Sequence, residues 1–164
     1  MTMRQYDAAL DRALVRSWID GRDTFRWLAG DDGDGTDADP DSWRTLPGSS
    51  RWIMEREGRP VAYGEIEEHT AEHYAQIARI LVDPAKRGKG AGREMARLLG
   101  AAARTLHPAW PVYARLDADN LAALLAYPAA GLAPLEPLPP DFDDRSVWLI
   151  LLDDEPPDRG GRLD

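Results

Sequence analysis

Hydrophobic residues recur with a helical period near the start of the chain. Asp7, just before this pattern, is a residue type that caps helix N-termini, and Gly21 follows the pattern as a helix-ending residue. Together they predict a helix between Asp7 and Gly21. A short strand begins at Tyr6, and a second, shorter helix ends at Gly30. The apolar positions are Leu10, Leu14, Val15, Trp18 and Ile19 in the first helix and Phe25, Trp27 and Leu28 in the second.

The middle of the chain changes to a β pattern. Residues 51–57 and 60–68 predict two strands, and Glu57-Gly58 between them is typical of a hairpin turn. Residues 73–82 predict a third strand, whose apolar second half indicates a central place in a sheet.

Helices and strands alternate in the second half of the chain. Apolar residues at steps of three and four predict one long helix over residues 91–106. Residues 111–116 and 145–152 predict strands, and a turn-rich segment precedes the second of them. Residues 120–127 predict a short helix capped by Asp117 or Asp119. This order of elements predicts an α/β fold.

The composition bounds the architecture. The chain has 164 residues, of which 43% are hydrophobic, enough for the core of one domain, which we place at residues 1–152. Residues 153–164 are rich in Asp, Pro, Gly and Arg and predict a disordered tail. No apolar run approaches the length of a membrane span, and the N-terminus lacks a signal sequence, so we expect a cytoplasmic protein.

Cysteine content and charge exclude several classes of function. The chain contains no cysteine, which excludes disulfides, a thiolate nucleophile and a Cys-based zinc site. Its formal net charge of −9 argues against nucleic acid as a partner and weakly favours a cationic one.

The most specific chemistry lies in the turn between the third strand and the long helix. Glycines at alternate positions let the backbone approach a ligand closely, and the helix start presents unpaired N–H groups to an anion. The spacing fits neither the dinucleotide fingerprint nor the P-loop. The turn therefore predicts another kind of phosphate or pyrophosphate site. Its glycines are Gly88, Gly90 and Gly92, and its cations are Lys86, Arg87 and Lys89.

Two motifs, which together cover roughly residues 76–132, resemble those of the GCN5-related N-acetyltransferase (GNAT) family. The first resembles the acetyl-coenzyme A motif of that family and is Arg87-x-x-Gly90-x-Gly92, preceded by Val82-Asp83-Pro84. The second is Asn120-x-x-Ala123-x-x-x-Tyr127-x-x-x-Gly131-Leu132, in which Leu132 replaces the usual Phe.

The resemblance implies both a fold and a co-substrate. The fold is a mixed, mostly antiparallel central sheet flanked by helices, whose central strands splay apart to admit the pantetheine arm of acetyl-CoA. Neither a metal nor a membrane partner is implied, and a monomer or a homodimer fits. The implied cofactor-binding residues are the strand end Ile80, Leu81 and Val82, the turn Arg87, Gly88, Lys89, Gly90, Ala91 and Gly92, and also Asn120.

The resemblance also implies catalytic roles. Tyr127 stands where the family has its general acid, and a phenol with a reference pKa of about 10 keeps its proton at neutral pH. Where many members carry a Glu base, this chain has Gln76, which can hold a water but cannot accept a proton. We take Glu65 as the candidate base. Other candidates are Glu67, Glu72 and His73. For each of the four, the alternative is an exposed strand residue without a catalytic role.

The acceptor is the least defined part of the prediction. Six Asp residues from Asp31 to Asp41 form either a solvated loop or an acidic rim that attracts a cation. We expect a small cationic primary amine as acceptor. A protein N-terminus or lysine, or a non-catalytic acyl-CoA sensor, remains an alternative. Either core packing or an acceptor pocket accounts for Trp18, Trp27 and Trp43.

Overall fold

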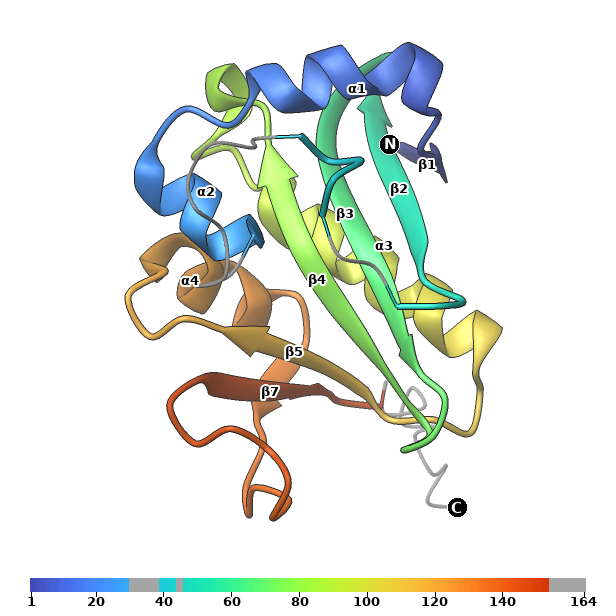
Figure 1. Ribbon diagram of the computed structural model, residues 1–164, viewed down its shortest axis with the longest axis vertical. Helices are drawn as coiled ribbons and strands as arrows, with labels where there is room; N and C mark the ends of the chain where they lie inside the picture. Colours follow the sequence, from blue (N-terminus) through green and yellow to red (C-terminus); the bar gives the residue numbers. More distant parts are fainter. Residues whose placement is uncertain (30–38, 44–45, 154–164) are drawn as a thin grey trace, which may run out of the picture.

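A single twisted sheet organises the protein (Figure 1). The computed structural model describes residues 1–29, 39–43 and 46–153. The described strands form one seven-stranded sheet in the order β1-β2-β3-β4-β5-β7-β6. The strands are β1 Thr2–Gln5, β2 Ser50–Arg56, β3 Arg59–His69, β4 Tyr74–Val82, β5 Val112–Leu116, β6 Leu132–Pro134 and β7 Val147–Leu151.

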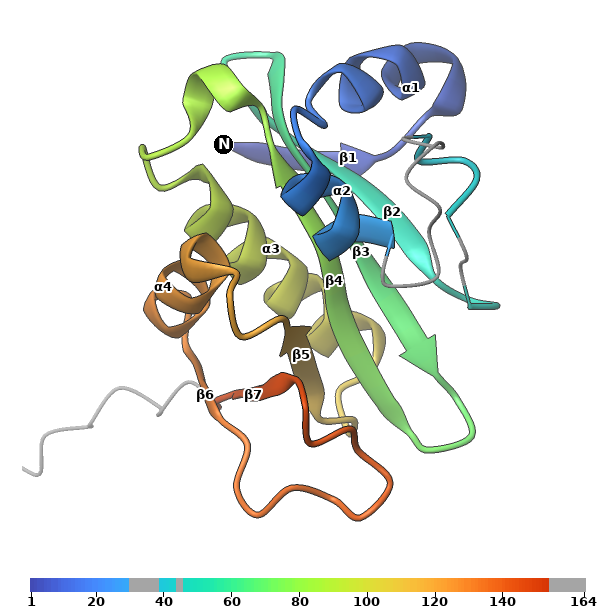
Figure 2. The same cartoon turned by 60° about the vertical axis from the view of Figure 1, so that its left-hand side comes forward.

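The described residues form four α-helices, which cover the two faces of this sheet. Figures 1 and 2 show α3 and α4 on one face and α1 and α2 on the other. A 3-10 turn at Pro84–Lys86 leads from β4 toward α3. The helices are α1 Ala8–Ser17, α2 Arg22–Ala29, α3 Ala91–Leu106 and α4 Leu121–Ala129.

The pairing of β4 with β5 opens the sheet. All other neighbouring strands pair antiparallel, whereas these two run parallel and pair only from Ala75–Val112 to Ile77–Ala114. Strand β4 then continues to Val82 without β5 beside it. The mixed, mostly antiparallel sheet and the splayed centre are those that the sequence predicts.

Two apolar clusters fill the layers. Alternate residues of a strand face opposite sides of the sheet, so Ile53 and Tyr63 join the cluster under α1, whereas Met54 and Ala62 join the cluster under α3 and α4. The larger cluster lies under α3, where Met95 and Leu99 are fully buried.

Most predicted elements are found, with errors at their ends. Asp7 caps α1 as predicted, but α1 ends at Ser17, before Gly21. The first strand precedes Tyr6, and β6 is a three-residue strand that the sequence pattern did not indicate. The cap of α4 is Asn120, so the prediction of Asp117 or Asp119 was wrong.

The predicted inner face of α1 is also partly wrong. Leu10 and Leu14 are 72% and 38% exposed, whereas Val15 is fully buried. A polar residue, Asp11, takes the buried position one turn earlier, because its carboxylate accepts hydrogen bonds from Arg4 at 2.7 and 2.8 Å. The predicted tail after residue 153 and most of the Asp-rich segment lie outside the described residues.

Candidate active site

A cavity of about 230 Å³ lies where β4 and β5 separate. Its walls come from elements far apart in the sequence, namely α2, the end of β4, the glycine turn, the end of β5 and α4. Predicted site residues that line it are Ile80, Leu81, Val82, Arg87, Gly92, Asn120 and Tyr127.

A second, more polar cavity adjoins the first. It has a volume of about 240 Å³ and shares Trp27, Ala78, Arg79 and Asp117 with the first cavity. Glu67 and Gln76 line only this second cavity. We call the first, mostly apolar cavity the slot; the second, charged cavity lies beside it.

The end of β4 provides backbone groups to the slot. The β4–β5 ladder stops at Ile77, so residues 80–82 at the end of β4 have no strand partner on the β5 side within the described chain. Such a stretch offers N–H and C=O groups that need a partner, as an extended ligand would supply.

The glycine turn ends in an anion-binding helix start. Gly88 and Gly90 have φ of 73° and 80°, a conformation that L side chains rarely adopt. Gly90 caps α3 without a side-chain hydrogen bond, which leaves the first amides of the helix available. A Cβ at Gly92 would make only ordinary contacts with Val82 and Ala126, at 3.7 and 3.9 Å. The protein itself therefore does not require Gly92, whereas a ligand approaching the backbone would.

Arg87 is held against the N-terminal region. Its guanidinium donates to Asp20 Oδ2 at 2.7 Å and to the Trp18 carbonyl at 3.1 Å. It also donates to the carbonyl of Val82 at 3.3 Å. Its charge is thus already shared with a carboxylate, so Lys86 and Lys89 are the more accessible cations of the turn.

Tyr127 and Asn120 lie together on the α4 side of the slot. Tyr127 is only 5% exposed, and burial raises the pKa of its phenol. Its hydroxyl has no hydrogen-bond partner among the described residues, and the ring lines the slot. Asn120 accepts a hydrogen bond from the Ala123 amide at 3.2 Å, so it caps α4 as well as lining the slot.

Glu65 does not reach either cavity. It is fully buried, and burial raises the pKa of its carboxyl. Arg79 donates to one of its oxygens at 2.6 Å and the Tyr63 hydroxyl donates to the other. These contacts place Glu65 as a paired carboxylate in the interior, not as the exposed strand residue that the sequence offered as the alternative to a base.

Glu67 and Gln76 do face the second cavity and stand opposite each other on β3 and β4. Arg79 donates to Glu67 Oε1 at 3.0 Å. The importance of Arg79 was missed from the sequence, although a charged residue inside the apolar run from Ile77 to Val82 is a signal that could have found it.

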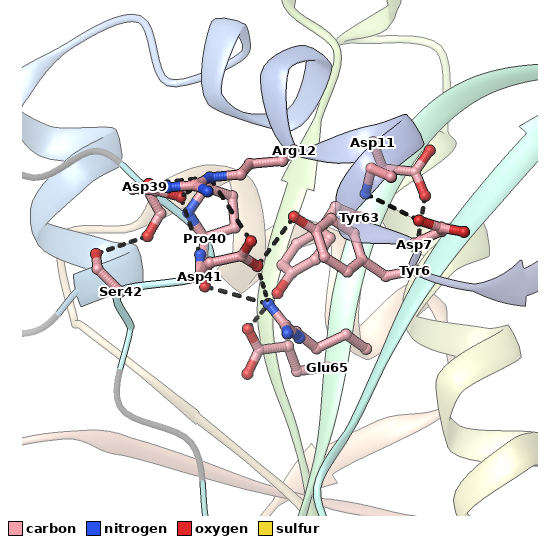
Figure 3. Close-up of polar contacts among 12 residues, drawn as sticks. Tyr6, Asp7, Asp11, Arg12, Asp39, Pro40, Asp41, Ser42, Tyr63 and Glu65 are labelled. Carbon is pink, nitrogen blue, oxygen red and sulfur yellow. Dashed lines mark hydrogen bonds and ion pairs between the residues drawn. The ribbon is translucent and has the colours of Figure 1, made fainter.

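The described part of the Asp-rich segment forms ion pairs within the chain (Figure 3). Asp39 is buried against Arg12, whose Nε donates to it at 2.9 Å. Asp41 accepts from Arg51 at 2.6 Å and from the Tyr6 hydroxyl at 3.2 Å. These two carboxylates are therefore neither simply solvated nor available to a substrate cation.

The three tryptophans divide between the two predicted roles. Trp18 and Trp43 are buried in the core under α1, whereas Trp27 lines both cavities. Trp43 Nε1 is buried and has no hydrogen-bond partner among the residues that the structure describes.

The described residues contain no group of three or more His, Asp or Glu side chains placed to hold a metal ion. Among them, no helix is long and apolar enough to cross a membrane.

Comparisons with known proteins agree with this geometry. The model of the Acetyltransferase (GNAT) family matches residues 13–132. The structure of aminoglycoside acetyltransferase AAC(6')-Ib with ribostamycin and coenzyme A matches with a TM-score of 0.69 at 18% identity, covering 91% of each chain. An acyl-CoA N-acyltransferase from Pseudomonas aeruginosa matches with a TM-score of 0.59 at 16% identity, covering 92% of this chain and 97% of that one. At such identities the likeness shows the fold. No curated protein sequence matches significantly.

Proposed function

Because the chain belongs to the acetyltransferase (GNAT) family, we propose that it binds acetyl-CoA in the slot between β4 and β5 and acetylates a primary amine. Family membership makes it an N-acetyltransferase enzyme. One observation carries the specific proposal. The slot has at its mouth a helix start without a side-chain cap, and in its wall a phenol that makes no hydrogen bond with the described residues.

The helix start of α3 would hold the pyrophosphate of the co-substrate. Its free amides, the dipole of a 16-residue helix and the cations Lys86 and Lys89 all favour an anion there. On the side of β4 that faces away from β3, the backbone of residues 80–82 would bond the pantetheine amides, as an added strand does. Arg87 can join this site only by giving up part of its contact with Asp20.

Acetyl transfer would proceed by direct attack of the amine on the thioester carbon. A C–N bond forms and the C–S bond breaks, and backbone N–H groups at the β4 end would stabilise the oxyanion between these events. The Tyr127 hydroxyl would give its proton to the departing thiolate. Burial raises the pKa of Tyr127, which keeps this proton in place until the thiolate forms.

The proton of the amine must leave by a different route. Glu65 is poorly placed for this role, because its two oxygens are occupied and it lies outside both cavities. We propose that a water between Gln76 and Glu67 in the second cavity accepts the proton, since both side chains can hold a water there.

The second cavity is the proposed acceptor site. Its lining includes the guanidiniums of Arg26, Arg79 and Arg115 besides the carboxylates of Glu67 and Asp117. Glu67 is paired with Arg79 at 3.0 Å, whereas Asp117 makes no ion pair within 4 Å among the described residues. Asp117 would therefore be the carboxylate that attracts a protonated amine before the amine loses its proton. The aminoglycoside acetyltransferase of similar fold is a precedent for a small cationic acceptor, because it was solved with kanamycin and with ribostamycin.

Calorimetry with acetyl-CoA, followed by a thiol-release assay over a panel of amines, tests the proposal. The panel contains aminoglycosides, polyamines and peptides with a free N-terminus or lysine. We expect binding and fastest release with a small polycationic amine. Absence of binding would refute the proposed function. Tight binding without turnover on any amine would favour the non-catalytic sensor, for which Gln76 in place of a base is the supporting observation.

A further inference from the structure

Helix α2 lies at the open side of the gap between β4 and β5 (Figures 1 and 2). This gap has no ladder hydrogen bonds across it after Ile77 and Ala114. Beyond these residues, hydrogen bonds between β4 and β5 do not fix the distance between the two strands. Contacts with another element must therefore set the width of the slot.

The β4 wall of the slot is hydrogen-bonded to the C-terminal turn of α2. Arg79 Nε donates to the carbonyl of Leu28 at 2.8 Å. Arg79 lies on a bulge of β4, where the register against β3 shifts, and its φ of 49° is left-handed. A non-glycine residue keeps such a conformation only when its surroundings hold it. The carboxylates of Glu65 and Glu67 do so, at 2.6 and 3.0 Å from the guanidinium.

The β5 wall of the slot is bonded to the same turn of α2 through Asp119. This residue follows β5 and directly precedes the Asn120 cap of α4. Arg26 donates to Asp119 Oδ2 at 2.6 Å, and the indole N–H of Trp27 donates to Oδ1 at 3.1 Å. The hydrogen bond from Arg26 lowers the pKa of Asp119, so the link is ionic at neutral pH.

A third link connects the segment before α2 to the glycine turn. Arg87 donates to Asp20 at 2.7 Å and to the Trp18 carbonyl at 3.1 Å. Residues 18–28 are therefore bonded to the β4 bulge, to the turn after β5 and to the glycine turn. These are the three segments that would hold the thioester, the α4 wall with Tyr127 and the pyrophosphate.

We propose that α2 is a brace that sets the width of the slot, and that Asp119 is its positioning residue on the β5 side. The inference rests on the proposed function, because the width matters to catalysis only if the pantetheine arm lies in the slot. The β4 amides and Tyr127 lie on opposite sides of the slot. A misplacement of about 1 Å between such groups is enough to lower turnover substantially.

Asp119 suits a test because it does not belong to the core. Its side chain is 60% exposed, so Asp119→Ala should leave the fold intact. We expect the Kd for coenzyme A to rise about 3- to 10-fold and kcat to fall by a similar factor, with Tm changed little. Asp23→Ala is the matched control, because Asp23 pairs with the same Arg26 at 3.6 Å but lies within α2 and bridges nothing. The control should bind and turn over as the wild type does.

Two further variants separate the ionic link from a general effect of the substitution. Asp119→Asn keeps an oxygen that can accept from Trp27 but loses the charge, so it should give an intermediate Kd. Exchange of the charges, Arg26→Asp with Asp119→Arg, should recover part of the affinity that either single change loses, because the ion pair returns while the indole N–H of Trp27 stays without its acceptor. If Asp119 had only a structural role, its substitution would lower Tm, and exchanging the charges would not restore the affinity for coenzyme A.

Hydrogen exchange tests the brace even if the chain binds no coenzyme A. Amides of α2 should exchange faster in Asp119→Ala than in Asp23→Ala or the wild type. Unchanged exchange in α2 would overturn the brace whatever the chain binds. Equal Kd and kcat for Asp119→Ala and a coenzyme A-binding wild type would also overturn it. A wild type that binds no coenzyme A would refute the proposed function alone.

Discussion

A negative charge introduced at Gly92 should raise the stability of the protein while weakening its binding of the co-substrate. Gly92 is the second residue of α3, and a side chain there would meet only Val82 and Ala126 at ordinary distances. Replacing a helical glycine stabilises by up to about 1 kcal/mol, and a carboxylate in the first turn adds roughly 0.3–1 kcal/mol. Gly92→Glu should therefore raise Tm by roughly 2–6 °C.

The same change should impair binding of coenzyme A. A carboxylate about 5 Å from two phosphate charges costs roughly 2–6 kcal/mol, depending on the effective dielectric constant. The lower value already corresponds to an increase of about 30-fold in Kd. Isothermal calorimetry with coenzyme A and a thermal melt measure the two effects on one preparation.

Ala101→Glu is the control for the added charge. Ala101 is exposed on the same helix, about 14 Å from Gly92 along the axis, which exceeds a Debye length of about 8 Å. Its Kd should stay within about twofold of the wild type. A Gly92→Glu variant that melts higher than the wild type and binds coenzyme A equally well would refute the assignment of the pyrophosphate to the α3 start.

Three other residues give simpler predictions. Tyr127→Phe should lower kcat about 100-fold and leave the Kd for coenzyme A unchanged, which a thiol-release assay checks; unchanged turnover would leave Tyr127 as a packing residue. Asp39→Asn should lower Tm but leave KM for a cationic amine unchanged, because Asp39 is paired with Arg12; a raised KM would restore the acidic rim. Hydrogen bonds, first from Ser146, lower the pKa of Asp143 from 3.8 to about 2. Since this folded pKa lies below the usual value, the stabilisation is present above about pH 4 and is lost as pH falls toward 2. The Tm difference between wild type and Asp143→Asn should shrink over that interval, and a constant difference would contradict the pairing.

Elements with strong local signals were predicted nearly to the residue. Helix α3 spans Ala91–Leu106 as expected, because its apolar stripe is continuous and Gly90 marks its start. The β2–β3 hairpin turns at Glu57 and Gly58, both with positive φ, as the dipeptide indicates. Strand β6 was missed because three residues carry no period, and it exists only through its pairing with β7.

The sequence by itself determined the glycine turn that we propose as the pyrophosphate site. Gly88, Gly90 and Gly92 and the start of α3 are contiguous, so their geometry follows from backbone rules that act within one turn. The motif around Tyr127 is equally local, although the residues it faces are not.

Only the tertiary structure decided which charged residues serve the site and which serve the fold. Glu65 and Glu67 lie on the same face of β3, yet Glu65 lies outside both cavities with its oxygens bonded to Tyr63 and Arg79, whereas Glu67 faces the second cavity. Asp119 binds α2 although 93 residues separate it from Arg26. Such assignments depend on strand register, in which a slip of one residue moves every side chain to the opposite face. No pattern along the chain encodes that choice, because it is made by the packing of all the elements at once.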